Sequence, residues 1–246
     1  MSGAGPALDA AVLVRALAAL EEGRIRARAA ARALGAADPG SAAQVVASLA
    51  RDRTPPARVA VAAIAQALAD PDAELPYAWR ADLYAAALEA GLAEVAALVL
   101  APPPLRAWTP PRDQDARLAH LTLGHKKALA RGRRDPDLLA RLGAQGEPAV
   151  VAELLRNPAL TEPFVVRIAA RRPCRPETLR CIFASRWRTR PAVARAVARN
   201  PYAEPEIAAK LAATLPRADL EALANDHAVH PLVRGLAERL ARPVTR

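Results

Sequence analysis

Arginine and tryptophan alternate in one short stretch of the second half of the chain. This stretch reads Ser185-Arg186-Trp187-Arg188-Thr189-Arg190. A guanidinium can bind a carboxylate or a phosphate through two parallel hydrogen bonds, and an indole can stack on a base or fill an apolar pocket of a partner. The stretch therefore predicts a binding site for an anionic macromolecule. Alternatively, the tryptophan fills a gap between helices and the arginines are solvated.

Two further pairs of arginines flank this stretch, and each pair is spaced four residues apart. In a helix this spacing places both side chains of a pair on one face, opposite the apolar residues that would be buried. Stacked helices could align the pairs into one ridge, although charge on an outer helix face is also ordinary solubility. The predicted binding residues are Arg167, Arg171, Arg186, Trp187, Arg188, Arg190, Arg195 and Arg199.

The cysteines and histidines occur in patterns that favour structural roles. Cys174 and Cys181 are seven residues apart, but Pro176 argues against one helix that carries both. His227 and His230 could supply two metal ligands, yet no third or fourth ligand follows at a useful spacing. The sequence therefore predicts no metal and no redox centre.

No enzyme signature is complete in this sequence. The run 124–127, Gly-His-Lys-Lys, lacks the earlier glycine and the closing hydroxyl residue of a phosphate-binding loop. There is no G-x-S-x-G motif, and the acids at Asp135 and Asp137 stand at a helix start, where acids favour the helix dipole. We therefore expect no catalytic residue and no cofactor.

The positive charge is concentrated in the second half of the chain. The net charge is +10; residues 113–246 hold 24 Lys plus Arg against 14 acids, whereas residues 1–112 hold 11 of each. Such a concentration favours an anionic partner, either an acidic protein surface or nucleic acid. With 32 Arg and only three Lys, a GC-rich genome could also account for part of this usage.

The composition predicts an all-α protein. Of the 246 residues 52% are apolar, but there are only two Phe, three Tyr and three Trp, so Ala, Leu and Val must build the core. Two cysteines suit a reducing cytoplasm rather than a disulfide framework. The most apolar window, 83–101, contains Glu89 and Glu94, so we expect no membrane insertion.

One short sequence pattern, called the doubled phrase below, occurs twice, 43 residues apart. Pro-Ala-Val at 148–150 leads to Arg-Asn-Pro at 156–158, and Pro-Ala-Val at 191–193 leads to Arg-Asn-Pro at 199–201. We interpret Arg as the end of a helix, Asn as a turn residue or N-cap, and Pro as a first-turn residue. Short helices joined by proline corners predict a solenoid-like helical repeat.

A proline-rich segment marks the predicted domain boundary. Five prolines lie between residues 101 and 112 and exclude a regular helix. We therefore predict an N-terminal helical domain at 1–100, a linker at 101–116 and a basic helical-repeat domain at 117–246. Trp108 either belongs to a polyproline ligand for a partner or pins a stiff spacer.

The C-terminal half resembles a known repeat family. The doublets that carry the resemblance are Asn157-Pro158 with Glu162-Pro163, Arg172-Pro173 with Arg175-Pro176-Glu177, and Asn200-Pro201 with Glu204-Pro205-Glu206. Over residues 137–242 this pattern is similar to the leucine-rich-repeat variant family and its HEAT-like relatives. That resemblance implies a right-handed array of short helices, some of them 3₁₀, that acts as a binding scaffold. The spacing of the corners here is uneven, and the cysteine cluster that carries an iron–sulfur centre in one such protein is missing, so no cofactor is implied.

Two functions are compatible with these features. The first is a non-enzymatic scaffold that binds an acidic protein surface through its arginines. The second is binding to the nucleic-acid backbone, because HEAT-like DNA glycosylases share the size, the helical repeats and the basic character, although none of their catalytic residues can be matched here. The sequence specifies neither the partner nor the oligomeric state.

Overall fold

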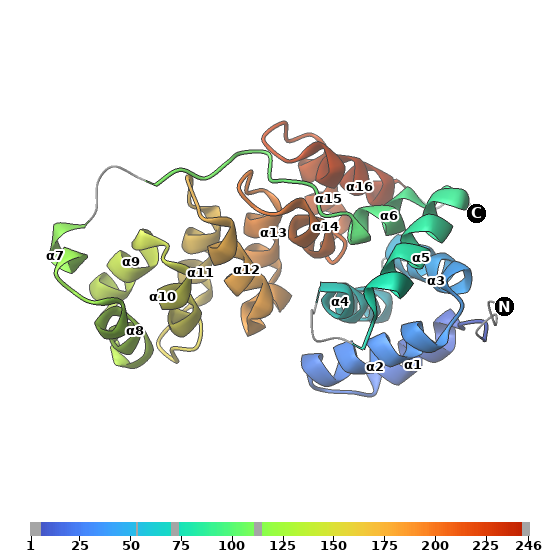
Figure 1. Cartoon of the computed structure of the whole chain (residues 1–246), viewed down its shortest axis with the longest axis horizontal. Helices are drawn as coiled ribbons and strands as arrows, with labels where there is room; N and C mark the ends of the chain where they lie inside the picture. The colour runs from blue at the N-terminus through green and yellow to red at the C-terminus, as the bar shows by residue number, and fades with distance from the viewer. Residues whose placement is uncertain (1–5, 53, 70–73, 111–114, 243–246) are drawn as a thin grey trace. The chain divides into compact units, whose positions relative to one another are not determined.

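The computed structural model describes residues 6–52, 54–69, 74–110 and 115–242, and within these ranges all regular structure is helical (Figure 1). The prediction of an all-α protein is confirmed. Proline opens many of the helices because it has no amide hydrogen to leave unpaired in the first turn. At other helix starts an aspartate accepts from a free amide, as Asp9 does from Val12 and Asp135 does from Asp137.

The chain is divided into two compact units. Unit 1 comprises Met1–Ala101, Ala209–Asp226 and Pro231–Arg246. Its helices are α1 (Ala10–Ala18), α2 (Gly23–Ala36), α3 (Pro39–Arg51), α4 (Pro55–Ala69), α5 (Tyr77–Glu89), α6 (Ala93–Val99), α15 (Arg217–Ala224) and α16 (Pro231–Ala241). Small side chains dominate its core, where α2 packs on α4 and α15 packs on α16. The sparse aromatic content is thus accommodated by closely packed helices.

Unit 2 comprises Pro102–Ala208 and His227–His230. Its helices are α7 (Ala116–Ala119), α8 (Leu123–Gly132), α9 (Pro136–Gln145), α10 (Pro148–Leu154), α11 (Glu162–Ala170), α12 (Pro176–Ala184), the 3₁₀ helix η1 (Arg186–Thr189) and α13 (Pro191–Ala198). The boundary between the units falls within α14 (Pro205–Ala212). None of these helices could bury an apolar face alone, so their stability comes from packing on neighbours.

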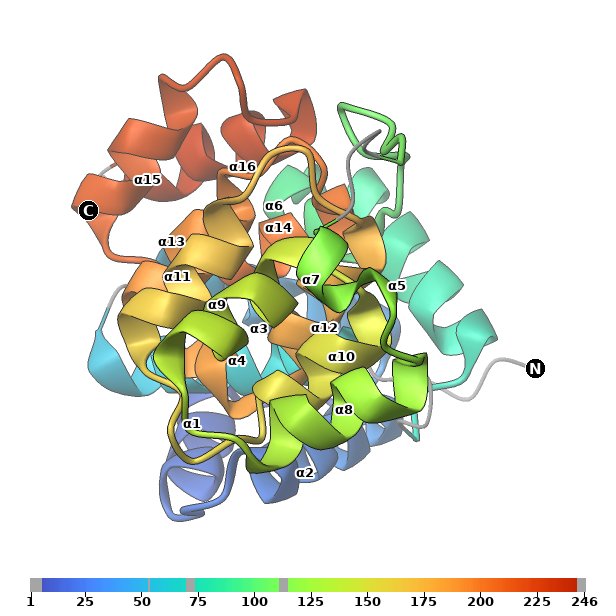
Figure 2. The same cartoon turned by 90° about the vertical axis from the view of Figure 1, so that its left-hand side faces the viewer.

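The doubled phrase folds into the same local structure twice. α8 packs on α10, and α11 packs on α13 (Figure 2). Asn157, buried after the end of α10, donates to the carbonyls of Ala130 and Arg133 at 2.7 and 2.8 Å, which are the C-terminal carbonyls of α8. The helices of this pair are therefore parallel, since their C-terminal ends meet.

Asn200 repeats this arrangement after α13. It donates to the carbonyls of Ala169 and Arg171 at the end of α11, at 2.7 and 3.0 Å. Each asparagine also accepts from the amide two residues further on, Ala159 or Tyr202. The predicted turn role is therefore present, but the sequence did not indicate the second role, in which the amide group satisfies carbonyls that a helix leaves unpaired.

The proline-rich segment lies on unit 2. The amide of Arg106 donates to the carbonyl of Pro201 at 3.0 Å, and the guanidinium of Arg175 lies 4.4 Å from the ring centroid of Trp108. These contacts pin the segment to the helices of the same unit. The division of the chain at residues 101 and 117 remains a prediction, and the compact units additionally group 209–226 and 231–246 with unit 1.

A basic groove in unit 2 as the candidate functional site

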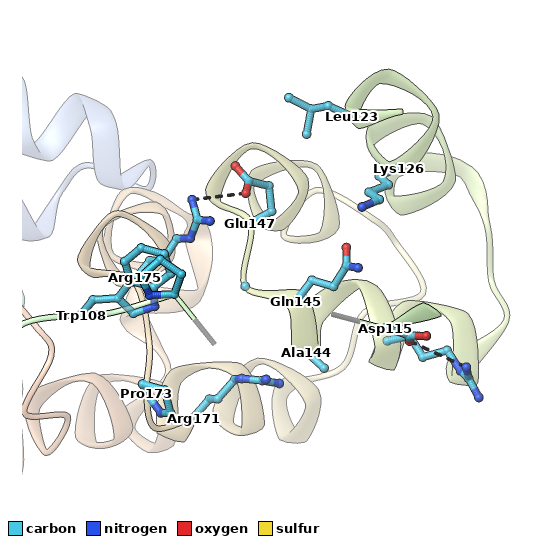
Figure 3. Close-up of a pocket in the computed structure, with 13 residues that line it drawn as sticks. Trp108, Asp115, Leu123, Lys126, Ala144, Gln145, Glu147, Arg171, Pro173 and Arg175 are labelled. Carbon is cyan, nitrogen blue, oxygen red and sulfur yellow. Dashed lines mark ion pairs between the residues drawn. The ribbon is translucent and has the colours of Figure 1, made fainter. Parts of the chain in front are cut away.

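A surface depression of about 540 Å³ lies between the proline-rich segment and the helices of unit 2 (Figure 3). Its lining includes four cations, Lys126, Arg141, Arg171 and Arg175. Arg175 forms an ion pair with Glu147 at 3.3 Å, and Arg141 forms one with Asp115 at 3.7 Å. Among the described residues, no carboxylate pairs with Lys126 or Arg171. The depression therefore carries an excess of positive charge.

A second depression of about 390 Å³ adjoins the first. It is lined by Phe164, Arg167, Ile168, Ala170, Ala140, Ala144 and Arg171. Ala144 and Arg171 line both depressions, so the two are adjacent. We call the combined feature the basic groove; it runs along α9 and α11 toward Trp108.

Two glycines, one within α9 and one at its C-terminal end, position the walls of the basic groove. A Cβ atom at Gly143 would lie 3.0 Å from the Cδ1 atom of Ile168, so the glycine permits the close approach of α9 and α11. Gly146 ends α9 in the left-handed region, with φ of 63°, which glycine adopts without strain. The hydroxyl of Thr178 donates to the Gly146 carbonyl at 2.7 Å and so ties α12 to this corner.

Two of the predicted binding residues line the basic groove. Arg167 on α11 and Arg171 just after its end both line it, with the Arg167 guanidinium 5.2 Å from the Phe164 ring centroid. The other six residues do not line it. Four of these, Arg188, Arg190, Arg195 and Arg199, lie on η1 or near the two ends of α13.

The arginines outside the groove are separated along the α11 and α13 pair. Arg190 pairs with Glu162 at 3.9 Å, at the N-terminal ends of both helices. Arg199 lies at their C-terminal ends, where its carbonyl accepts from Arg172 at 2.6 Å. Arg188 donates to the carbonyl of Phe183 at 3.4 Å. The structure therefore places Arg190 and Arg199 at opposite ends of the helix pair.

Trp187 is buried, with 7% of its surface exposed. Its indole Nε1 donates to the carbonyl of Leu155 at 3.0 Å, and the Arg186 guanidinium lies 5.0 Å from its ring centroid. The indole thus fills a space between η1 and the end of α10, which is the alternative position considered for it. It is not exposed for stacking on a partner.

Sequence reasoning missed three residues of the groove. The sequence places Lys126 only in an incomplete phosphate-binding loop, and Trp108 either in a polyproline ligand or in a stiff spacer. Arg175 was noted only within a proline doublet. One sequence feature could have indicated this part of the groove: a tryptophan within a proline-rich segment of a basic domain. An indole is rarely left fully solvated, so it predicts a contact with that domain.

Glu153 is a buried acid that distinguishes the first copy of the phrase from the second, which has Ala196. Its carboxylate accepts from Arg131 at 2.9 Å and pairs with Arg156 at 3.5 Å. The hydrogen bond from Arg131 lowers the pKa of Glu153 against the opposing effect of burial. This residue therefore joins α8 to α10 and serves the packing of the unit.

We expect Glu153 to make stability depend on pH. Because its folded pKa is lower than its unfolded pKa, its contribution is present above the unfolded value of about 4.3 and is lost as pH falls through the folded pKa. In Glu153→Gln, the urea midpoint of unfolding should fall less between pH 6 and pH 3 than in the wild type. Glu238→Gln, which alters an exposed pair with Arg242, is the control. Equal pH dependence of Glu153→Gln and wild type would contradict this role.

Other reactive groups do not extend the site. Burial raises the pKa of Cys174 to about 11, so this thiol is protonated near neutral pH. Within the described ranges, no three His, Cys, Asp or Glu side chains are grouped so that they could hold a metal ion. In the same ranges, no helix combines the length and the apolar character needed to cross a bilayer.

Comparison with family models, curated proteins and solved structures finds no match to this chain. The fold and the groove define its class as an all-α protein with a basic groove on one of two compact helical units.

Proposed function

We propose that this protein is a non-enzymatic helical scaffold that binds an acidic protein segment through unit 2. The observation that carries the proposal is the distribution of charge between the units. The two segments of unit 2 contain 20 Arg plus Lys against 10 Asp plus Glu, whereas those of unit 1 contain 15 of each. The whole net charge of +10 therefore belongs to unit 2. A compact unit with such an excess attracts anionic partners over several ångströms.

Part of this charge has no acidic partner within unit 2. Among the described residues, no carboxylate pairs with Arg167, Arg171, Arg172 or Arg186. Arg172 donates to a backbone carbonyl, and Arg186 lies over the ring of Trp187. Carboxylates supplied by another protein could pair with these guanidinium groups bidentately.

The aromatic residues beside the arginines favour protein over nucleic acid. Phe164, Trp108 and Trp187 each have a guanidinium over the ring, and Phe164 and Trp187 are also buried. Binding of single strands normally uses exposed rings on which successive bases stack. Unit 2 has cations but few exposed aromatic rings. Binding to nucleic acid is therefore the result that would contradict the proposal in the following experiment.

Fluorescence anisotropy with two labelled probes tests the proposal. The probes are a 20-residue peptide rich in Glu and Asp, with its Gln/Asn analogue as control, and a 20-nucleotide single strand. We expect the acidic peptide to bind at about 50 mM salt and to bind at least tenfold more tightly than its neutral analogue. No binding of the acidic peptide would overturn the proposal, as would a clear preference for the nucleotide strand with a steep dependence on salt.

Matched charge reversals locate the binding to unit 2. Replacing Arg167, Arg171 and Arg186 with Glu should weaken binding of the acidic peptide at least tenfold, because three exposed cations become acids. The control replaces three exposed arginines of unit 1, Arg15, Arg24 and Arg28, with Glu. Both triple variants lower the net charge equally. Equal losses of affinity in the two variants would show a nonspecific charge effect and would contradict a site on unit 2.

A further inference from the structure

We propose that the basic groove binds a short acidic peptide segment that also carries apolar side chains. The apolar side chains would rest on the floor of the groove, and the carboxylates would pair with cations along its sides. This inference rests on the proposed function and adds the location of the site and the chemistry of the segment.

The floor of the groove is apolar and shallow. Ala140 and Ala144 lie one helical turn apart on α9, both exposed, and Ala170 is exposed on α11. Beneath them lie the buried side chains of Phe164 and Ile168. Because these alanines have short side chains, small or branched apolar groups of a partner could reach this surface. Burying them would stabilise a complex by the hydrophobic effect.

The far end of the groove offers a second apolar contact. Leu123 on α8 is 50% exposed and lines the first depression together with Trp108 and Pro173. In Figure 3 the labelled residues Leu123 and Trp108 lie on opposite sides of this depression. A segment that extends from Ala140 to Leu123 could therefore place apolar side chains at both ends.

The cations along the sides supply charge complementarity. Arg167 and Arg171 line the α11 side, and Lys126 lies on α8. No carboxylate among the described residues pairs with any of the three. The remaining arginines of the groove, Arg141 and Arg175, already form ion pairs with acids. These three cations, which have no acidic partner among the described residues, therefore lie along the apolar floor of the groove.

The openness of the floor favours a peptide over a small molecule. Sites for small molecules usually enclose most of the ligand surface. Here several lining residues, including Ala140, Ala144 and Arg171, are exposed, and two depressions of about 540 and 390 Å³ lie side by side with Ala144 and Arg171 in common. An elongated, open groove with cations along it matches an extended or helical acidic segment.

Substitution of Ala144 tests the groove directly. Ala144 lines both depressions, so Ala144→Glu places a carboxylate beside Arg171 and Ala144→Trp covers the floor. Each variant should weaken binding of an acidic, leucine-containing peptide at least tenfold. The matched controls are Ala184→Glu and Ala184→Trp, because Ala184 is also exposed in the last turn of a helix of unit 2 but does not line the groove. These controls should remain within about twofold of wild type, as expected for surface substitutions.

A pair of peptides tests the apolar contacts. The first alternates Glu with Leu at helical spacing, and the second has the same charges with Ser in place of Leu. Wild type should bind the leucine peptide at least fivefold more tightly, and Ala144→Trp should lose this preference. Equal binding of the two peptides by wild type would overturn the inference.

The outcomes separate this inference from the proposed function. If both Ala144 variants bind acidic peptide like wild type, while wild type still prefers the acidic peptide to its neutral analogue at least tenfold, the groove floor is not the site but the function stands. If wild type binds no acidic peptide, the proposed function fails. Circular dichroism of every variant checks that the helices are retained, so that a loss of binding reports on the groove.

Discussion

Replacing Trp187 with Ala should lower the free energy of unfolding of unit 2 by about 3–5 kcal/mol, the range observed when a buried large aromatic side chain is truncated. The ring is almost completely buried, and its Nε1 hydrogen bonds to the Leu155 carbonyl at 3.0 Å. The substitution would leave a cavity between η1 and α10 and a carbonyl without its donor. Urea unfolding followed by circular dichroism should show a transition at markedly lower urea.

Trp187→Phe separates packing from hydrogen bonding. The phenyl ring keeps most of the apolar volume but cannot donate to Leu155, so we expect a loss of about 1–3 kcal/mol, smaller than that of the alanine variant. Because the indole is internal, the Phe variant should still bind the acidic peptide within about twofold of wild type. A stable Phe variant with tenfold weaker binding would instead assign Trp187 to the binding site. An unchanged midpoint in Trp187→Ala would contradict its structural role.

Asn157→Ala and Asn200→Ala should each destabilise unit 2 by about 1–3 kcal/mol, because each removes a buried amide that satisfies two carbonyls. Those carbonyls are Ala130 and Arg133 in the first copy, and Ala169 and Arg171 in the second. The control is Asn225→Ala. Asn225 is exposed and donates to a carbonyl one turn earlier, so its replacement should cost less than about 0.5 kcal/mol. The measurement is again the urea midpoint.

The aspartate variants distinguish the two roles of these asparagines. Asn157→Asp and Asn200→Asp keep the oxygen that accepts from Ala159 or Tyr202, but they replace the donor group with a second oxygen. If the turn contact were the main role, aspartate would be tolerated. If the contact with the helix end dominates, a carboxylate facing two carbonyls should destabilise at least as much as alanine. Aspartate variants as stable as wild type would show that the turn contact dominates.

The all-α class and many helix starts could be predicted from the sequence because they depend on local chemistry. Alanine-rich apolar patterns, with few aromatic residues, favour closely packed helices. Proline removes a hydrogen-bond donor, so it suits first turns, and Pro148, Pro176 and Pro191 occupy them. Pro158 and Pro201, for which the sequence predicts the same role, lie instead in the turns before α11 and α14. The concentration of arginine in the second half was equally visible, since counting charges requires no coordinates.

The candidate site could be predicted only in part. The spacing of Arg167 and Arg171 predicts one shared helix face; both line the basic groove, although Arg171 lies just after the end of α11 in extended conformation. An indole among arginines predicts a recognition site at Trp187, yet the ring of Trp187 is buried. Sequence spacing shows which face of a helix a residue shares, but it does not show which neighbour covers that face.

The sequence by itself determined that this protein is built from short helices with proline at their starts, and that its positive charge belongs to one part of the chain. These properties follow from single residues and their nearest neighbours. Tertiary structure alone decided that Lys126, Ala144 and Arg171 share one groove, and that Asn157 and Asn200 satisfy the ends of helices 24 to 31 residues earlier. Such contacts depend on how helices pack, and packing depends on the combined shape of residues far apart in the chain.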